Sequence, residues 1–426
     1  MSTEHRPIEH RPIEWIANTR AREIATSEAV ARVFPEGVFE RTRRFHRQIP
    51  GYRPSPLRTL AHLANMLDVG GIWVKDESQR LDLNSFKVLG GSFAIYQFIR
   101  SQLGLDGEDL TYEELVGEAT RARIGDITFA TATDGNHGRG VAWGAAKLNC
   151  KAVIYVHKDT SIARIRAIEA YGADVRVVDG NYDDAVHQAS RDAAANGWQI
   201  ISDTSWPGYT DIPSWVMQGY TTMLTEAQEQ LAGTGIVKPT HVFVQAGVGA
   251  LAAATAGFYS SRFGEERPTT IVVEPSEARC LYHSAKIGDG NPHDVEGELQ
   301  TIMAGLACGE PSPIAWDVLW DTIDAFVACP DYVAAKGMRV YGVPLAGDPF
   351  IVSGESGAVT LGALTFVADY AEFGDLKEYL GLDHNSQVLL INSEGNTDPQ
   401  YFRRVVWEGA NSVPGPYRWS PRLEQH

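Results

Sequence analysis

The chain has 426 residues, of which 54 are acidic and 37 are basic, so its formal net charge is −17 at pH 7. This excess of acid argues against a broad nucleic-acid-binding surface, because such surfaces use basic side chains to neutralise phosphates. The content of 44% hydrophobic and 21% charged residues is typical of a soluble globular protein. No stretch approaches the ~18 apolar residues that span a bilayer, and the length suits about two domains.

The N-terminal residues and the cysteines favour a cytoplasmic protein. Residues 1–15 are charged, carry a proline-broken repeat and lack the apolar core of a secretory signal, so we expect a flexible arm there. The four cysteines form no C-x-x-C pair, and they are Cys150, Cys280, Cys308 and Cys329. This spacing predicts buried thiols and no metal site.

Short apolar segments alternate with helical segments along the chain. We predict strands at residues 72–75, 127–130, 152–156, 175–178, 199–202, 241–245, 270–274 and 387–392. Helices are predicted at residues 137–148, 162–171, 215–231 and 358–370. The alternation predicts an α/β fold with mostly parallel sheets and right-handed crossovers.

Two sheets are expected, since four strand–helix units fit between residues 88 and 203. We therefore predict a smaller α/β domain at residues 88–205, inserted into a larger domain of residues 16–87 and 206–426. Ligands bind at the carboxyl ends of the strands in such sheets, so the loops that follow the strands should carry the chemistry.

The first conspicuous loop ends in a lysine. The run Asn84-Ser85-Phe86-Lys87 precedes the apolar residues 88–91. A lone lysine is usually a solvated surface group. The apolar residues that follow would draw this side chain inward, and loss of hydration would lower the pKa of its amine. Lys87 is therefore a candidate Schiff-base nucleophile.

Two further loops each join a strand to a helix. Residues 130–138 suit either a helix cap and turn or a site for a carboxylate, and composition alone does not choose between the two. Residues 245–251 contain Gly247 and Gly249, which would let the backbone close on a phosphate at a helix N-terminus. A dinucleotide fingerprint is not favoured, because Ala252 occupies the third glycine position.

A fourth loop, at residues 392–397, follows the last predicted strand and is by itself an ordinary polar turn. The order of the four loops, however, resembles that of the fold type II pyridoxal-phosphate enzymes, the tryptophan synthase β and threonine dehydratase-like group. The longer strings are similar to those of the diaminopropionate ammonia-lyase family. They lie at residues 75–80, 84–91, 131–141, 203–204, 206, 208–209, 212–213, 217–220 and 245–250.

The resemblance implies a fold of two three-layer α/β/α domains and the cofactor pyridoxal 5′-phosphate. Lys87 would bind the cofactor covalently, with Phe86 beside it. Asn136 would contact the ring hydroxyl, and Ser393 would face the pyridine nitrogen. Backbone N–H groups of five consecutive residues would hold the phosphate, and these are Gly247, Val248, Gly249, Ala250 and Leu251.

The resemblance also implies a reaction, the α,β-elimination of D- and L-2,3-diaminopropionate to pyruvate and ammonia through an aminoacrylate. Asp134 stands where the wider group carries a small residue. Lys87 and Asp134 would then be bases on opposite faces of the substrate, and Asp203 would be a third catalytic residue. The substrate-binding residues would be Ser85, Thr133, Asp134 and Asp203.

Three alternatives remain open from the sequence. The chain could be a lyase for serine, threonine or another β-substituted amino acid, a non-catalytic amino-acid sensor on the same scaffold, or a nicotinamide-dependent oxidoreductase, which the missing third glycine disfavours. Members of the family are often dimers, so the resemblance implies a homodimer that acts on a small amino acid and needs neither a membrane nor a nucleic acid.

Overall fold

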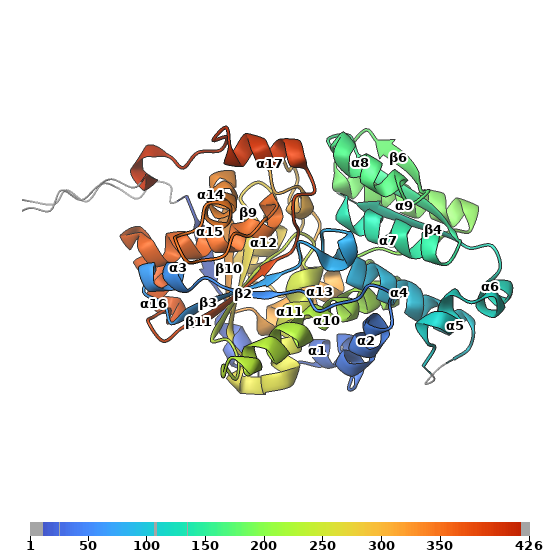
Figure 1. Cartoon of the computed structure of the whole chain (residues 1–426), viewed down its shortest axis with the longest axis horizontal. Coiled ribbons are helices and arrows are strands. Elements are labelled where there is room, and N and C mark those ends of the chain that lie inside the picture. Colours follow the sequence, from blue (N-terminus) through green and yellow to red (C-terminus); the bar gives the residue numbers. More distant parts are fainter. Residues whose placement is uncertain (1–11, 25, 106–108, 134, 419–426) are drawn as a thin grey trace, which may run out of the picture.

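The computed structural model of the chain describes residues 12–24, 26–105, 109–133 and 135–418 (Figure 1). A seven-stranded sheet has the order β1-β10-β9-β8-β11-β3-β2, and a four-stranded sheet has the order β6-β5-β4-β7. Only the edge strands β1 and β2 pair antiparallel among the described residues. The strands are β1 (Glu14–Ala17), β2 (Leu57–Thr59), β3 (Gly71–Asp76), β4 (Thr128–Thr133), β5 (Lys151–His157), β6 (Asp174–Val178), β7 (Gln199–Ile200), β8 (His241–Gln245), β9 (Thr269–Pro275), β10 (Ala325–Cys329) and β11 (Gln387–Asn392).

Helices cover both sheets. They are α1 (Glu28–Val33), α2 (Val38–Arg47), α3 (Ala61–Met66), α4 (Lys87–Gln102), α5 (Tyr112–Val116), α6 (Glu118–Ile124), α7 (Asn136–Lys147), α8 (Ile162–Glu169), α9 (Tyr182–Asn196), α10 (Asp211–Gly233), α11 (Ala250–Phe263), α12 (Cys280–Ile287), α13 (Pro313–Thr322), α14 (Asp331–Gly342), α15 (Glu355–Asp369), α16 (Gly374–Leu380) and α17 (Pro399–Val406). Within the described ranges, no helix combines the length and the apolar character that crossing a membrane requires.

All eight predicted strands are present, and the four predicted helices correspond to α7, α8, α10 and α15. The sequence did not predict β1, β2 or β10. Glu14 and Trp15, which we expected in an N-terminal arm, lie in β1 and pair with Ala328 and Val327 of β10. Residues 1–11 of that arm lie outside the described residues.

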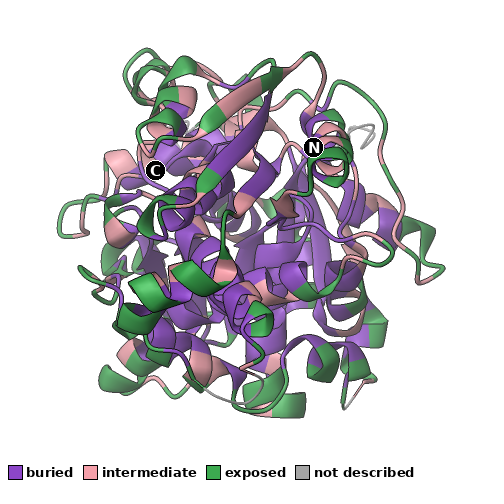
Figure 2. Cartoon of the chain, turned by 90° about the vertical axis from the view of Figure 1, so that its right-hand side faces the viewer, coloured by how far each residue is buried: buried purple, intermediate pink, exposed green. Residues whose placement is uncertain are grey.

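Both faces of the central strands of the seven-stranded sheet are buried, which explains why these strands are continuously apolar. In β8, the side chains of Val242 and Val244 pack in the core that contains α10, α11 and α13. Phe243, between them, packs in the opposite core with α14 and α15. Figure 2 shows buried residues filling the interior of the molecule and exposed residues on the outer helices.

The four-stranded sheet is built from residues between 128 and 200, in the green part of Figure 1. The chain moves outward through β4, β5 and β6 by way of α7 and α8, and α9 returns it to β7. Because parallel crossovers are right-handed, α7 and α8 cover one face and α9 covers the other. This arrangement brings the carboxyl ends of β4 and β7 side by side.

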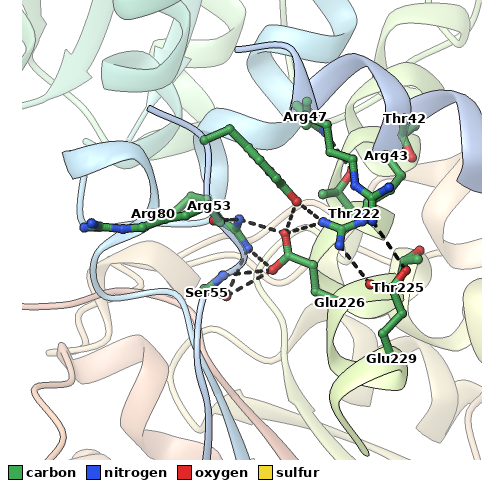
Figure 3. Close-up of polar contacts among 12 residues, drawn as sticks. Thr42, Arg43, Arg47, Arg53, Ser55, Arg80, Thr222, Thr225, Glu226 and Glu229 are labelled. Carbon is green, nitrogen blue, oxygen red and sulfur yellow. Dashed lines mark hydrogen bonds and ion pairs between the residues drawn. The ribbon is translucent and has the colours of Figure 1, made fainter. Parts of the chain in front are cut away.

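A buried ion network joins α2, β3 and α10. Figure 3 shows the part of it that surrounds Glu226, Arg43 and Arg80. Arg80 donates to both carboxylate oxygens of Glu226, at 2.9 and 2.7 Å. Arg43 of α2 lies 2.9 Å from the same carboxylate, and Lys75 of β3 lies 2.8 Å from it. Burial alone would raise the pKa of Glu226, but Arg80 and Lys75 hold that pKa below its usual range.

Candidate active site

A cavity lies where the carboxyl ends of β4, β7, β8 and β11 meet the start of α4. Every predicted site residue that the structure describes lines this cavity, although they come from five separate parts of the chain. They are Ser85, Phe86, Lys87, Thr133, Asn136, Asp203, Gly247, Val248, Gly249, Ala250, Leu251 and Ser393. Asp134, the remaining prediction, lies outside the described residues.

Lys87 is the first residue of α4, and its amine faces a buried carboxylate across the cavity. The Nζ atom of Lys87 donates a hydrogen bond to Oδ2 of Asp203, which follows β7. The Tyr182 hydroxyl, at the start of α9, donates to Oδ1 of Asp203 at 3.2 Å. Both oxygens of the carboxylate are thereby fixed, and one of them is held directly against the lysine.

His137 also lies near Asp203. Its Nε2 atom is 2.8 Å from the carbonyl oxygen of Ile201, which can only accept, so Nε2 carries a proton. Its Nδ1 atom is 4.0 Å from Oδ2 of Asp203. Burial alone would raise the pKa of Asp203, but Lys87 foremost, then His137 and Tyr182, hold that pKa well below its usual range.

The glycine loop between β8 and α11 has the backbone shape of an anion site. Gly249 precedes the first residue of α11 and has φ +103°, a conformation that glycine adopts without strain. A Cβ atom on Gly247 would lie 2.9 Å from Sγ of Cys308, so only glycine fits there. The described first turn of α11 has no acidic residue and no side-chain cap, so its N–H groups suit a phosphate.

In the loop between β4 and α7, the side chain of Thr133 caps the start of the helix. The Thr133 hydroxyl accepts hydrogen bonds from the N–H groups of Gly135 and Gly138, at 2.9 and 3.0 Å. Asn136 begins α7 and donates from Nδ2 to the buried carboxylate of Glu394 at 2.6 Å. The helix-cap interpretation of this loop therefore holds for Thr133, while Asn136 has a second amide hydrogen for a ligand.

Ser393 follows β11 and is held from two sides. Its carbonyl oxygen accepts the N–H of Phe86 at 3.2 Å, which ties the Lys87 loop to the C-terminal loop. Its hydroxyl is 2.7 Å from Nε2 of Gln245, the last residue of β8. A hydroxyl fixed in this way at the cavity wall suits a heterocyclic nitrogen.

Several cavity residues had no role in the sequence interpretation, and these are His137, Tyr182, Gln245, Gly305, Leu306, Cys308, Ser356 and Glu394. His137, Gln245 and Glu394 stand next to or near predicted residues in the sequence, so they could have been identified as cavity residues. Tyr182 carried no signal, because its contact with Asp203 depends on the packing of α9. In the described part of the chain, no cluster of His, Cys, Asp and Glu is placed to hold a metal ion.

A family model described as "Pyridoxal-phosphate dependent enzyme" matches residues 49–393. Diaminopropionate ammonia-lyase of Salmonella typhimurium is 44% identical over 404 residues, which cover 95% of this chain and 100% of the relative. Its counterpart in Escherichia coli K12 is 47% identical over 382 residues, which cover 89% and 94% of the two chains. The chain belongs to the diaminopropionate ammonia-lyase family.

Solved structures agree with this family. The Escherichia coli diaminopropionate ammonia lyase in complex with an aminoacrylate-PLP azomethine reaction intermediate matches with a TM-score of 0.85 at 44% identity, covering 94% of this chain and 98% of that one. Threonine deaminase isoform 2 of Solanum lycopersicum, at 22% identity and a TM-score of 0.68, shares the fold. The expected fold type II architecture and the expected cofactor, pyridoxal 5′-phosphate, are therefore confirmed for this member of the family.

Proposed function

We propose that this protein is a carbon–nitrogen lyase that converts D- and L-2,3-diaminopropionate and water into pyruvate and two molecules of ammonia. Family membership over 95% of the chain supports this reaction. The observation that carries it here is the contact of Lys87 with Asp203 inside a cavity whose other wall is an anion-binding glycine loop. An amine-bearing substrate and a phosphorylated cofactor both fit that distribution of charge.

The cofactor would be held by residues whose geometry suits each of its parts. The N–H groups from Gly247 to Leu251 would bind its phosphate, and Asn136 would donate to its ring hydroxyl. Ser393 would donate to its pyridine nitrogen, and Phe86 would lie beside Lys87, whose Nζ is 5.8 Å from the Phe86 ring centre. When bound, pyridoxal phosphate supplies an electron sink for the negative charge that develops at the substrate Cα.

Lys87 would give up its covalent link to the incoming substrate, and its amine would then be a base for the Cα proton. Asp203 would hold and reorient that amine, since it already accepts a hydrogen bond from it. The same carboxylate would also attract the β-ammonium group that leaves as ammonia. Ser85 and Thr133 would bind the substrate from the adjacent loops.

Asp134 would be the base on the opposite face of the substrate and would serve the D-isomer. This role is a prediction from the sequence and the family. Asp134→Asn should lower kcat/KM for D-2,3-diaminopropionate about 100-fold, the effect of losing a general base. The L-isomer, served by Lys87, should be affected less. Equal losses for both isomers would contradict a two-base mechanism.

A serine lyase is the second candidate. It is favoured by a structure of the Escherichia coli relative in complex with D-serine, at 44% identity and a TM-score of 0.85. Pyruvate production from D- and L-2,3-diaminopropionate, D- and L-serine and L-threonine separates the two functions. Serine turnover with no turnover of diaminopropionate would refute the leading proposal.

The cofactor link has its own test. The purified protein should be yellow, and borohydride should remove the visible band and leave a modified Lys87 in a peptide map. Lys87→Ala should bind the cofactor without that modification. A colourless protein that binds no pyridoxal phosphate would exclude both lyase functions.

The organisation of the molecule is part of the same proposal. Residues 16–87 and 206–426 would form the larger, cofactor-binding domain, and residues 88–205 the smaller inserted domain. The two separate sheets support this division. We also propose a cytoplasmic homodimer, for which light scattering should give twice the mass of the chain.

A further inference from the structure

Gln245 makes a contact with the Ser393 hydroxyl whose direction can be determined. The side chain is buried, with 1% of its surface exposed. Its Nε2 atom lies 3.0 Å from the carbonyl oxygen of Ile391 and 2.7 Å from Oγ of Ser393. A carbonyl oxygen only accepts, so the nitrogen end of the amide must face Ile391.

This assignment fixes the role of the serine. One amide hydrogen of Gln245 goes to Ile391, and the second goes to Ser393. The Ser393 hydroxyl therefore accepts from Gln245, and its single hydrogen is available for another acceptor. Because Ser393 lines the cavity, that hydrogen can be directed into it.

The backbone of Gln245 belongs to a strand that is paired on both sides. Strands β8 and β11 pair in parallel, with Phe243 opposite Leu390 as the last registered pair. Beyond that pair, the Gln245 side chain continues the connection to β11 by bonding to Ile391. The amide is thus held by the central part of the seven-stranded sheet, which keeps it from turning over.

We propose that Gln245 is a positioning residue that holds Ser393 as a hydrogen-bond donor toward the pyridine nitrogen of the cofactor. This inference rests on the proposed cofactor site. A nitrogen that accepts a hydrogen bond from a neutral hydroxyl has no proton of its own. Gln245 thereby limits how strongly the ring withdraws electrons from Cα, which favours prompt loss of the β-amino group.

The direct test is the 15N NMR signal of pyridoxal phosphate labelled at the ring nitrogen and bound to the full-length protein. In the unmodified protein the signal should stay in the unprotonated range from pH 6 to pH 9. A protonated nitrogen there would overturn the inference without the use of any variant. It would leave the lyase proposal intact, because pyruvate formation is measured separately.

Gln245→Glu should reverse the hydrogen bond, because a carboxylate accepts from Ser393 and draws its hydrogen away from the cavity. We expect the ring-nitrogen signal to move toward the protonated range and the cofactor dissociation constant to rise about 3- to 10-fold, as for one lost hydrogen bond. Gln245→Met, which keeps the length and adds no charge, should weaken cofactor binding by a similar factor. A wild-type 15N signal in both variants would mean that Gln245 is only structural.

Ser393→Ala provides the matched control. If Gln245 acts through Ser393, adding Gln245→Met to Ser393→Ala should leave the position of the 15N signal unchanged. The cofactor dissociation constant should then change less than twofold. A full additional effect in the double variant would contradict the inference, because two residues that act as a unit are not additive.

Discussion

Glu226 and Asp203 are both buried carboxylates beside a lysine, yet they belong to very different surroundings. Glu226 contacts Lys75. It also contacts Arg80 and Arg43 and accepts the backbone N–H of Ser55 at 3.0 Å (Figure 3). Asp203 lines a cavity and contacts the amine of Lys87, whose side chain is 17% exposed. In both cases nearby cations outweigh burial and lower the pKa of the acid.

A structural buried charge and a functional one differ in what surrounds them. The cations around Glu226 are buried and connect three segments of the fold, so they are committed to holding it together. Lys87 and Asp203 come from different parts of the chain but face a common space that can admit a ligand. A depressed pKa alone does not separate the two cases, whereas the adjoining cavity does.

The largest loss of stability is expected at Glu226. Glu226→Gln should lower the free energy of unfolding by about 3–5 kcal/mol, because it leaves Lys75 buried without its anion and leaves Glu77 as the remaining anion of Arg80. Urea denaturation followed by circular dichroism measures the change. Glu229→Gln is the control, since this half-exposed acid pairs with the same Arg43 and should cost at most about 1 kcal/mol. Equal losses would show that the burial of Glu226 is not decisive.

At Asp203 we expect a large loss of activity and only a small loss of stability. Asp203→Asn should lower kcat/KM for L-2,3-diaminopropionate about 100-fold, or about 2.7 kcal/mol in the transition state. Its free energy of unfolding should remain within about 1 kcal/mol of the wild-type value, because Lys87 can be hydrated from the cavity. Steady-state pyruvate assays and the same urea titration measure both quantities. Destabilisation as large as that of Glu226→Gln would remove the distinction between the two sites.

Asp183 is a third buried carboxyl, and the acids Glu310 and Asp294 lie near it. Its Oδ2 atom accepts the N–H of Gly309 at 2.9 Å. Burial, helped by Glu310 and Asp294, raises its pKa from 3.8 to about 7. The folded protein then retains a proton that the unfolded chain releases, so this contribution to stability is complete below pH 3.8 and is lost as the pH rises to about 7.

Asp183→Asn should therefore flatten the dependence of stability on pH between pH 4 and 7, by at most about 1.4 kcal/mol per pH unit. Urea midpoints measured at half-unit intervals give the two slopes. If both proteins lose stability equally over this range, Asp183 does not titrate as expected.

Tyr182→Phe should have the smallest effect. It removes one hydrogen bond to Asp203 and should lower kcat/KM about fivefold, close to 1 kcal/mol. Tyr155→Phe is the control, because Tyr155 also donates to a carboxylate, that of Asp192, but does not line the cavity. A similar loss of activity in the control would point to a general effect of removing a buried hydroxyl.

Much of the fold and of the candidate site could be predicted from the sequence, because both depend on local patterns. Continuous apolar runs mark the central strands, and small polar residues mark the loops at their ends. Strand β10 escaped prediction because Ala325–Cys329 follows the apolar helix α13 with no glycine or proline between them. Strands β1 and β2 are short edge strands with little apolar pattern.

Long-range partners could not be predicted. Lys75, Glu77 and Arg80 stand in a string that resembles the family, and nothing local indicates that Arg80 lies against Glu226, which is 146 residues further along the chain. Tyr182 likewise reaches Asp203 only because α9 packs across the four-stranded sheet. Such contacts depend on how the elements are assembled, which a single sequence does not display.

The position of strand β11 has a consequence for the folding of the protein. It lies between β8 and β3 in the seven-stranded sheet, so β2 and β3 are joined to the other strands only through it. Before β11 takes its place, no strand joins β2 and β3 to the rest of the sheet, and the facing edges of β3 and β8 are unpaired. Ser393 follows β11 directly, so the proposed cofactor site is completed only together with this strand, and until then the open edges are vulnerable to mispairing.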